Sequence, residues 1–263
     1  MKIKIYQVDA FADKLFAGNP AAVCPLDRWI SDAEMKSIAM ENNLSETAFF
    51  VKEDDVFHIR WFNQQAIETE LCGHATLASA HVLFNHEGFE GDEISFNSLS
   101  GILKVKKNGN DLTLNFPVDE YERVKTPGQL SISLNIQPIE CYKGKTDYML
   151  VYEKEEQIIK LNPNFIAMVM LEGRGVICTA RGTQADFVSR FFAPQSGINE
   201  DAVTGSAHTT LTPYWSNILG KKELTAQQLS SRKGSLRCKN LGDRIEISGQ
   251  AKTYLKGEIE IAK

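Results

Sequence analysis

The sequence predicts an α+β fold built from two related halves, and two observations support this. Runs rich in Val, Ile, Phe and Tyr outnumber the helical segments without alternating steadily with them, which favours a largely antiparallel or mixed sheet over a doubly wound one. The second observation is a repeat: RWFN at residues 60–63 leads into ELCGHAT at 70–76, and RFFA at 190–193 leads into EDAVTGSA at 200–207. Each copy is typical of an apolar strand, a polar loop and a glycine before a helix.

Glycines repeat at one common offset, because Gly101 and Gly109 match Gly234 and Gly242. Between the halves, residues 117–134 contain a Pro-Gly pair and few apolar side chains, as expected of a boundary. We therefore expect a first half at residues 1–120 and a second half at 121–263, with the last strand a candidate to pack back on the first half.

The first half contains strand-like runs at residues 3–11, 47–51, 57–63, 101–106 and 111–116. Two helices are expected between them. Ser31 and Glu34 form the S-x-x-E pattern of a capping box, and the apolar residues behind them recur at helical spacing. The second helix is expected over residues 74–84.

The second half repeats this order. Asn162 and Pro163 are typical of a helix start. The helix that they open carries Ile166, Val169 and Met170. The later elements are strands at residues 176–180 and 186–192, a helix from Ser206 that Pro213 should kink, and a hairpin joining 235–239 to 244–248.

Composition narrows the class of protein. A net charge of −5 and a pI near 5.6 argue against nucleic acid and anionic membranes as partners. We see no secretory signal, and no apolar run reaches the ~18 residues of a membrane span. Five scattered cysteines without a C-x-x-C pair indicate reduced thiols and no zinc site. No dinucleotide or P-loop motif is present. We expect a soluble cytoplasmic protein.

The two glycine-led helix starts are candidate anion sites. Gly73 precedes His74, and Gly205 precedes Ser206. A helix N-terminus offers unpaired N–H groups and the positive end of a dipole, which suits a carboxylate. A glycine alone can instead relieve strain at a turn, so the repetition in both halves is what supports the ligand-binding interpretation.

Several side chains near these glycines could take part in proton transfer. His74 titrates near neutral pH, although a packed or capping imidazole is the common case. Asp201 could orient such a histidine or simply cap a helix. Glu46 lies between the capped helix and an apolar strand, where a partly buried carboxylate is suited to acid–base catalysis. The corresponding stretch of the second half, residues 173–176, has no carboxylate. Cys72 is a candidate nucleophile or a small buried hydrophobe.

Four sequence motifs, taken together, resemble those of a known protein family. LSETAF at residues 44–49, GHAT at 73–76, EDAVTGSAH at 200–208 and FAGNPAAV at 16–23 resemble the PhzF-like family of phenazine-biosynthesis isomerases. The resemblance covers nearly the whole chain. It implies the diaminopimelate-epimerase fold, in which each half is a rolled sheet around a central helix and the active site lies between the halves. It also implies no cofactor and a homodimer.

Carried over by position, the resemblance implies that Glu46 is the acid–base group that shuttles a proton. His74, Asp201 and Ser206 match groups that position the substrate and assist proton movement, and Gly73 and Gly205 line the site. In the phenazine enzyme a proton moves within trans-2,3-dihydro-3-hydroxyanthranilate, so we expect an isomerase of a small carboxylated metabolite, with a cyclic one as the candidate.

One comparison with related epimerases concerns the cysteine. Those enzymes and proline racemase use two cysteines, one from each half. Here Cys72 matches Thr204, whose hydroxyl is too weak an acid or base for that task. Two alternatives stay open: an amino-acid epimerase or racemase that uses Cys72, and a non-catalytic protein that binds small acids on the same scaffold.

Overall fold

The computed structural model describes residues 1–54 and 56–261. The chain divides into two compact units. Unit 1 comprises Met1–Asn115 and Ser248–Lys263, and unit 2 comprises Phe116–Ile247. Within the described residues, no helix is both long and apolar enough to cross a membrane.

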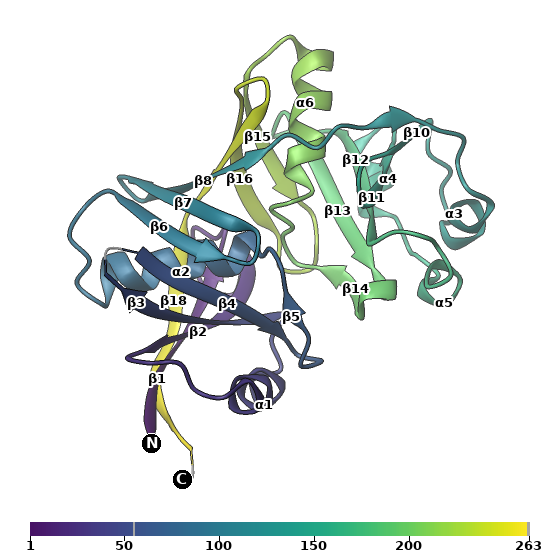
Figure 1. Cartoon of the computed structure of the whole chain (residues 1–263). Helices are drawn as coiled ribbons and strands as arrows, with labels where there is room; N and C mark the ends of the chain where they lie inside the picture. Colours follow the sequence, from purple (N-terminus) through teal and green to yellow (C-terminus); the bar gives the residue numbers. More distant parts are fainter. Residues whose placement is uncertain (55, 262–263) are drawn as a thin grey trace. The chain divides into compact units, whose positions relative to one another are not determined.

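Unit 1 is a mixed sheet with two helices, coloured purple to blue in Figure 1 apart from its last, yellow strand. Its elements are β1 (Lys2–Ala10), β2 (Asn19–Leu26), α1 (Asp32–Asn42), β3 (Glu46–Glu53), β4 (Val56–Asn63), β5 (Glu68–Thr69), α2 (Gly73–Asn85), β6 (Glu93–Ser98), β7 (Gly101–Asn108), β8 (Asp111–Pro117) and β18 (Ala251–Glu260). The strands pair in the order β18–β1–β2–β3–β4–β6–β7–β8, and only β2–β3 and β4–β6 are parallel.

Helix α2 is the core of unit 1. It packs against β1, β2, β3, β7 and β18, and nearly all of its residues from His74 to Leu83 are buried. A helix that is apolar on all sides belongs in an interior, so the sheet curls around it. Helix α1 has the predicted capping box, because Ser31 Oγ accepts from the Glu34 N–H and the Glu34 carboxylate accepts from the Ser31 N–H.

Unit 2 repeats the pairing order of unit 1. Its elements are β9 (Glu122–Arg123), α3 (Gly128–Ser133), β10 (Glu140–Lys143), β11 (Asp147–Val151), α4 (Glu155–Ile159), α5 (Phe165–Met168), β12 (Gly175–Arg181), β13 (Phe187–Ala193), the 3₁₀ turn η1 (Pro194–Ser196), β14 (Ile198–Asp201), α6 (His208–Leu219), β15 (Glu223–Gln228), β16 (Gly234–Asn240) and β17 (Arg244–Gly249). Strands β10–β11–β12–β13–β15–β16 have the same sequence of parallel and antiparallel pairs as β1–β2–β3–β4–β6–β7.

Helix α6 takes the place of α2 and contacts β15 and β16. Its buried face includes Trp215, whose indole N–H donates to Thr179 Oγ1 at 2.9 Å and whose ring stacks on Phe187. The helix begins at His208 and not at Ser206, since residues 205–207 form a turn. The prediction that Ser206 opens the helix was therefore wrong by two residues.

The predicted helix at Asn162 was also wrong in position and role. The structure has a single four-residue turn, α5, capped by Asn164. The three apolar residues expected on it, Ile166, Val169 and Met170, are exposed. Helical spacing over such a short segment does not specify a core face, because too few turns exist to define one.

Candidate functional site

The predicted site residues fall into two clusters, one in each unit. Glu46 is the first residue of β3, and His74 is the second residue of α2. With Cys72 and the neighbouring side chains of Asn19 and Ser45, they form what we call the acid–base cluster of unit 1. Asp201, Gly205 and Ser206 belong to unit 2.

The imidazole of His74 bridges the acid–base cluster. Its Nε2 lies 3.2 Å from Glu46 Oε2. Its Nδ1 lies 3.6 Å from Cys72 Sγ on the other side of the ring. Carboxylate, imidazole and thiol therefore form a continuous series of groups that can exchange protons.

Two polar side chains fix the orientation of this ring. Ser45 Oγ donates to Asn19 Oδ1 at 3.2 Å, which leaves the Asn19 amide N–H for His74 Nδ1 at 3.3 Å. Ser45 Oγ also lies 3.3 Å from His74 Nε2. Both ring nitrogens thus have partners, as expected of a buried histidine.

The cluster is largely shielded from water. The side chains of His74 and Glu46 are 8% and 13% exposed, and Cys72 is buried. Burial lowers the pKa of His74, but the neighbouring Cys72 sulfur and the Glu46 carboxylate outweigh it and hold that pKa well above its usual value. Burial raises the pKa of the Cys72 thiol.

Glu46, Cys72 and His74 are also spaced closely enough to hold a metal ion, since one ligand atom from each lies within 4.8 Å of the others. A histidine binds a metal through one nitrogen. Here one ring nitrogen faces the carboxylate and the other faces the thiol. This arrangement suits a proton relay better than three ligands directed at one ion.

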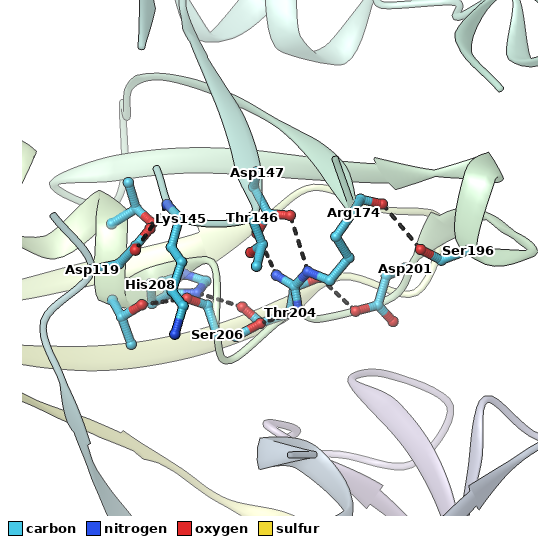
Figure 2. A network of polar contacts seen from close by, with 12 residues as sticks. Asp119, Lys145, Thr146, Asp147, Arg174, Ser196, Asp201, Thr204, Ser206 and His208 are labelled. Atoms are coloured by element: carbon cyan, nitrogen blue, oxygen red, sulfur yellow. Dashed lines mark hydrogen bonds and ion pairs between the residues drawn. The ribbon is translucent and has the colours of Figure 1, made fainter. Parts of the chain in front are cut away.

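The predicted residues of unit 2 surround Arg174, which the sequence had not singled out. The Arg174 Nε–H donates to Asp147 Oδ1 at 3.0 Å, and its Nη2–H donates to Asp147 Oδ2. Its Nη1–H donates to Ser206 Oγ at 2.9 Å. Figure 2 shows Arg174 among Asp147, Ser206 and Asp201, and we call these residues with Thr204 the arginine cluster.

Asp201 is held at one end of this cluster. Its Oδ2 accepts a hydrogen bond from Thr204 Oγ1 at 2.5 Å. Gln228 fixes the same loop, because its Oε1 accepts from the Thr204 N–H at 2.8 Å and its Nε2–H donates to the Asp201 carbonyl at 2.8 Å. Burial lowers the pKa of Arg174, but the charges of Asp147, Asp201 and Asp119 outweigh it and raise that pKa.

His208 lies next to this cluster but has a structural role. Its Nδ1 lies 2.9 Å from the Thr204 carbonyl, four residues earlier. The corresponding residue of unit 1, Thr76, contacts the Cys72 carbonyl in the same way through its hydroxyl. Burial lowers the pKa of His208 to about 4, so this histidine is neutral at physiological pH.

Matching ion pairs fix the register of the internal repeat. Arg60 on β4 binds Glu68 through Nε and Nη2, and its guanidinium lies 5.1 Å from the Phe62 ring. Arg190 on β13 binds Glu200 through the same two nitrogens, and its guanidinium lies over the ring two residues later, at 4.8 Å.

With these arginines superposed, strand pairing assigns the remaining positions. Arg60 pairs with Phe49 and Arg190 pairs with Cys178. Counting back along β3 and β12 makes Ser45 equivalent to Arg174, and Glu46 equivalent to Gly175. The residues after the repeated glycines also correspond, so Ser45 contacts His74 just as Arg174 contacts Ser206.

The structure brings the predicted residues together, with Glu46, His74 and Cys72 in unit 1 and Asp201 and Ser206 in unit 2. The sequence did not predict the side chains that support them. Those supports are Asn19 and Ser45 in unit 1 and Asp147, Arg174 and Gln228 in unit 2. A signal existed for Arg174, because it stands in the stretch of the second half that aligns with the residues before β3. That stretch has a cation, whereas the corresponding stretch of the first half has a carboxylate.

Comparison with known proteins shows the family of this chain. The family model for phenazine biosynthesis-like proteins, PhzC-PhzF, matches residues 8–257. The chain is 48% identical to a protein of Pseudomonas aeruginosa named as an uncharacterized isomerase, over 99% of this chain and 100% of that one.

Solved structures give the same result. A PhzF family protein of Enterococcus faecalis superposes with a TM-score of 0.96 at 45% identity, covering 99% of this chain and 100% of that one. A hydroxyproline epimerase of Agrobacterium vitis superposes with a TM-score of 0.62 at 9% identity, covering 98% and 92%. The predicted diaminopimelate-epimerase-like fold is therefore confirmed.

Proposed function

Because this chain belongs to the phenazine biosynthesis-like (PhzC-PhzF) family, we propose that it is a cofactor-independent isomerase. In this proposal it shifts a proton on a small carboxylated metabolite, with a cyclic one as the candidate, in a reaction similar to that of trans-2,3-dihydro-3-hydroxyanthranilate isomerase, and Glu46 is the acid–base group. The observation that supports it best is the contact of 3.2 Å between Glu46 Oε2 and His74 Nε2 in a largely buried cluster.

The proton shift needs only one carboxylate. Glu46 takes a proton from one carbon of the substrate, and the electron pair of the broken C–H bond moves through an adjacent double bond. The resulting carboxylic acid returns the proton to a second carbon, so the molecular formula of the substrate does not change. His74 donates its Nε2–H to the Glu46 carboxylate and keeps it in one orientation.

The roles of the other predicted residues rest on the family resemblance. We assign His74 and Asp201 to assist proton movement, and Gly73, Gly205 and Ser206 to substrate binding. The same resemblance extends the proposal to a homodimer in the cytoplasm. Sedimentation of the purified protein at micromolar concentration should then give the mass of two chains.

The test of Glu46 is a substitution that removes its basicity and keeps its shape. Glu46→Gln should lower solvent-deuterium incorporation into dihydro-hydroxyanthranilate by about 10²–10⁴-fold. Binding of the same compound, followed by NMR in heavy water, should remain. Equal exchange rates in the variant and the wild type would contradict the assignment, and binding without exchange by the wild type would indicate a binding protein.

Strand β3, which carries Glu46 at its start, also offers a matched control at its end. Glu53 ends β3, and its Oε2 lies 3.3 Å from His58 Nε2, with side chains 52% and 34% exposed. This is the same pair of residue types at nearly the same distance, but open to water. Glu53→Gln should leave the exchange rate unchanged, so a loss with both variants would point to the strand and not to the site.

A second candidate function is an epimerase or racemase that uses Cys72. The contact between Cys72 Sγ and His74 Nδ1 favours it, because an imidazole can accept a thiol proton. The raised pKa of this thiol and the threonine at the matching position speak against it. Loss of amino-acid epimerisation in Cys72→Ala, with retention in Glu46→Gln, would establish this second function.

A further inference from the structure

Arg174 is held more firmly than an ordinary surface arginine. Its side chain is 38% exposed, but its carboxylate partner Asp147 is only 4% exposed. Two hydrogen bonds join them, and the guanidinium lies 5.2 Å from the centre of the Phe191 ring. A planar guanidinium with two parallel bonds to one carboxylate has a fixed direction.

The residues on either side of Arg174 must be glycines for this arrangement. Gly173 has φ of +111°, and a Cβ there would lie 2.7 Å from the Thr146 carbonyl oxygen. A Cβ on Gly175 would lie 2.3 Å from the Phe191 ring. The Gly-Arg-Gly sequence therefore lets the ring lie against the backbone beneath the guanidinium.

The third contact of Arg174 determines what Ser206 can do. Because the Nη1–H donates to Ser206 Oγ at 2.9 Å, this hydroxyl accepts from the arginine and keeps its own proton to donate. The Ser206 carbonyl accepts from the N–H and the hydroxyl of Thr209 at 3.1 and 2.7 Å. Both the backbone and the side chain of Ser206 are thus fixed.

We propose that Arg174 is a positioning residue that makes the Ser206 hydroxyl a directed hydrogen-bond donor to a carboxylate oxygen of the ligand. This inference rests on the proposed function, which makes the ligand a small carboxylic acid. A hydrogen bond to an ionised oxygen is roughly twice as strong as one to a neutral oxygen. Arg174 acts through Ser206 and sets a preference for acids over their neutral analogues.

The internal repeat supports a functional role for the position that Arg174 occupies. Ser45 occupies it in unit 1 and contacts His74 in the acid–base cluster, at 3.3 Å. In unit 2 the same pair of positions holds Arg174 and Ser206. The local charge is consistent with a positioning role, because Asp147 neutralises the guanidinium and the group offered to the ligand is a neutral hydroxyl.

Two probes of the same shape test the inference. Sodium benzoate carries a carboxylate, and benzamide replaces it with a neutral amide. We expect the wild type to bind benzoate more tightly than benzamide when both are titrated and the amide signals of Gly205 and Ser206 are followed by NMR. Equal affinity of the wild type for the two probes, or no binding of benzoate, would overturn the inference.

The variants separate positioning from charge. Arg174→Gln and Ser206→Ala should each weaken benzoate binding about tenfold and change benzamide binding less than about twofold. The double variant should lose no more than either single variant, because the two residues act as one unit. Arg174→Lys should also lose the preference, since an ammonium cannot reproduce the three bonds.

Arg60→Gln is the control, because it breaks a similar arginine–carboxylate pair in unit 1 and should leave benzoate binding unchanged. Full retention of benzoate binding in Arg174→Gln would overturn the inference, and so would full rescue by lysine or an equal loss for both probes. The isomerase proposal is tested by the exchange assay and this inference by the binding assay, so failure of one is distinguished from failure of the other.

Discussion

The acid–base cluster of unit 1 and the arginine cluster of unit 2 occupy equivalent positions of one repeated scaffold. In both, a residue just before a strand start contacts the residue that follows a repeated glycine. In unit 1 this pair is Ser45 and His74, and in unit 2 it is Arg174 and Ser206. The order of strand pairing is the same in both units, but the side chains at these positions differ in chemistry.

The difference shows how a duplicated fold can divide its tasks. Unit 1 supplies a carboxylate, an imidazole and a thiol, from Glu46, His74 and Cys72. At the matching positions unit 2 has a glycine, a serine and a threonine, which are not acid–base groups at neutral pH, together with the permanent cation of Arg174. In the proposed function, unit 1 therefore supplies the acid–base groups and unit 2 the fixed hydrogen-bond donors.

The largest effect on stability is expected at the arginine–glutamate pair that both units share. Arg190 is 13% exposed and donates to the carbonyls of Ile158 and Leu161 as well as to Glu200. Arg190→Ala leaves the partly buried Glu200 carboxylate and two backbone carbonyls without this partner and should lower the free energy of unfolding by about 4 kcal/mol. Urea unfolding at pH 7, followed by tryptophan fluorescence, measures this loss.

Arg60→Ala is the matched substitution in unit 1. Arg60 is 26% exposed, and its second partner, Asp32, is 63% exposed. The expected loss is smaller, about 2 kcal/mol, because water replaces part of the interaction. Equal losses for the two arginines would mean that the carbonyl contacts of Arg190 add nothing to stability.

The next prediction concerns the pH dependence of stability that His208 gives to unit 2. The pKa of His208 is lowered by burial to about 4, whereas in the unfolded chain it is near 6.5. The unfolded state therefore binds the proton first, and stability falls as the pH decreases from 6.5 to 4, by about 3 kcal/mol in total. His208→Thr copies Thr76 of unit 1 and should flatten this part of the curve of unfolding free energy against pH. An unchanged slope would assign the acid sensitivity to other groups.

The smallest effect concerns His74, whose pH dependence has the opposite sign. Its pKa is held above the usual value against the effect of burial by Cys72 and Glu46. Its contribution to stability is thus fully present below pH 6.5 and is lost as the pH rises through the folded pKa. In Glu46→Gln the His74 pKa, followed by imidazole NMR, should fall. A pKa that stays raised in this variant would show that the carboxylate does not set it.

Prediction from sequence succeeded where the signal was local. The capping box of α1 joins Ser31 to Glu34 across three residues, and alternation or apolar runs marked β1, β3, β4, β7 and β8 within their own length. Strand β2 was missed because its second residue, Pro20, interrupts the usual strand pattern. The helix expected after Pro163 was wrong, since periodicity alone cannot show which short segments face a core.

The sequence by itself determined the repeat and the family and was enough to propose the reactive residues, because all of these lie in contiguous motifs whose spacing can be recognised without a fold. Only the tertiary structure decided what supports them. Asp147 and Ser206 are 27 and 32 residues from Arg174. Arg174 reaches Asp147 because β11 and β12 pair side by side, with Asp147 opposite Gly175. Contacts of this kind depend on strand register, and register is fixed by the packing of a whole unit and by no short motif.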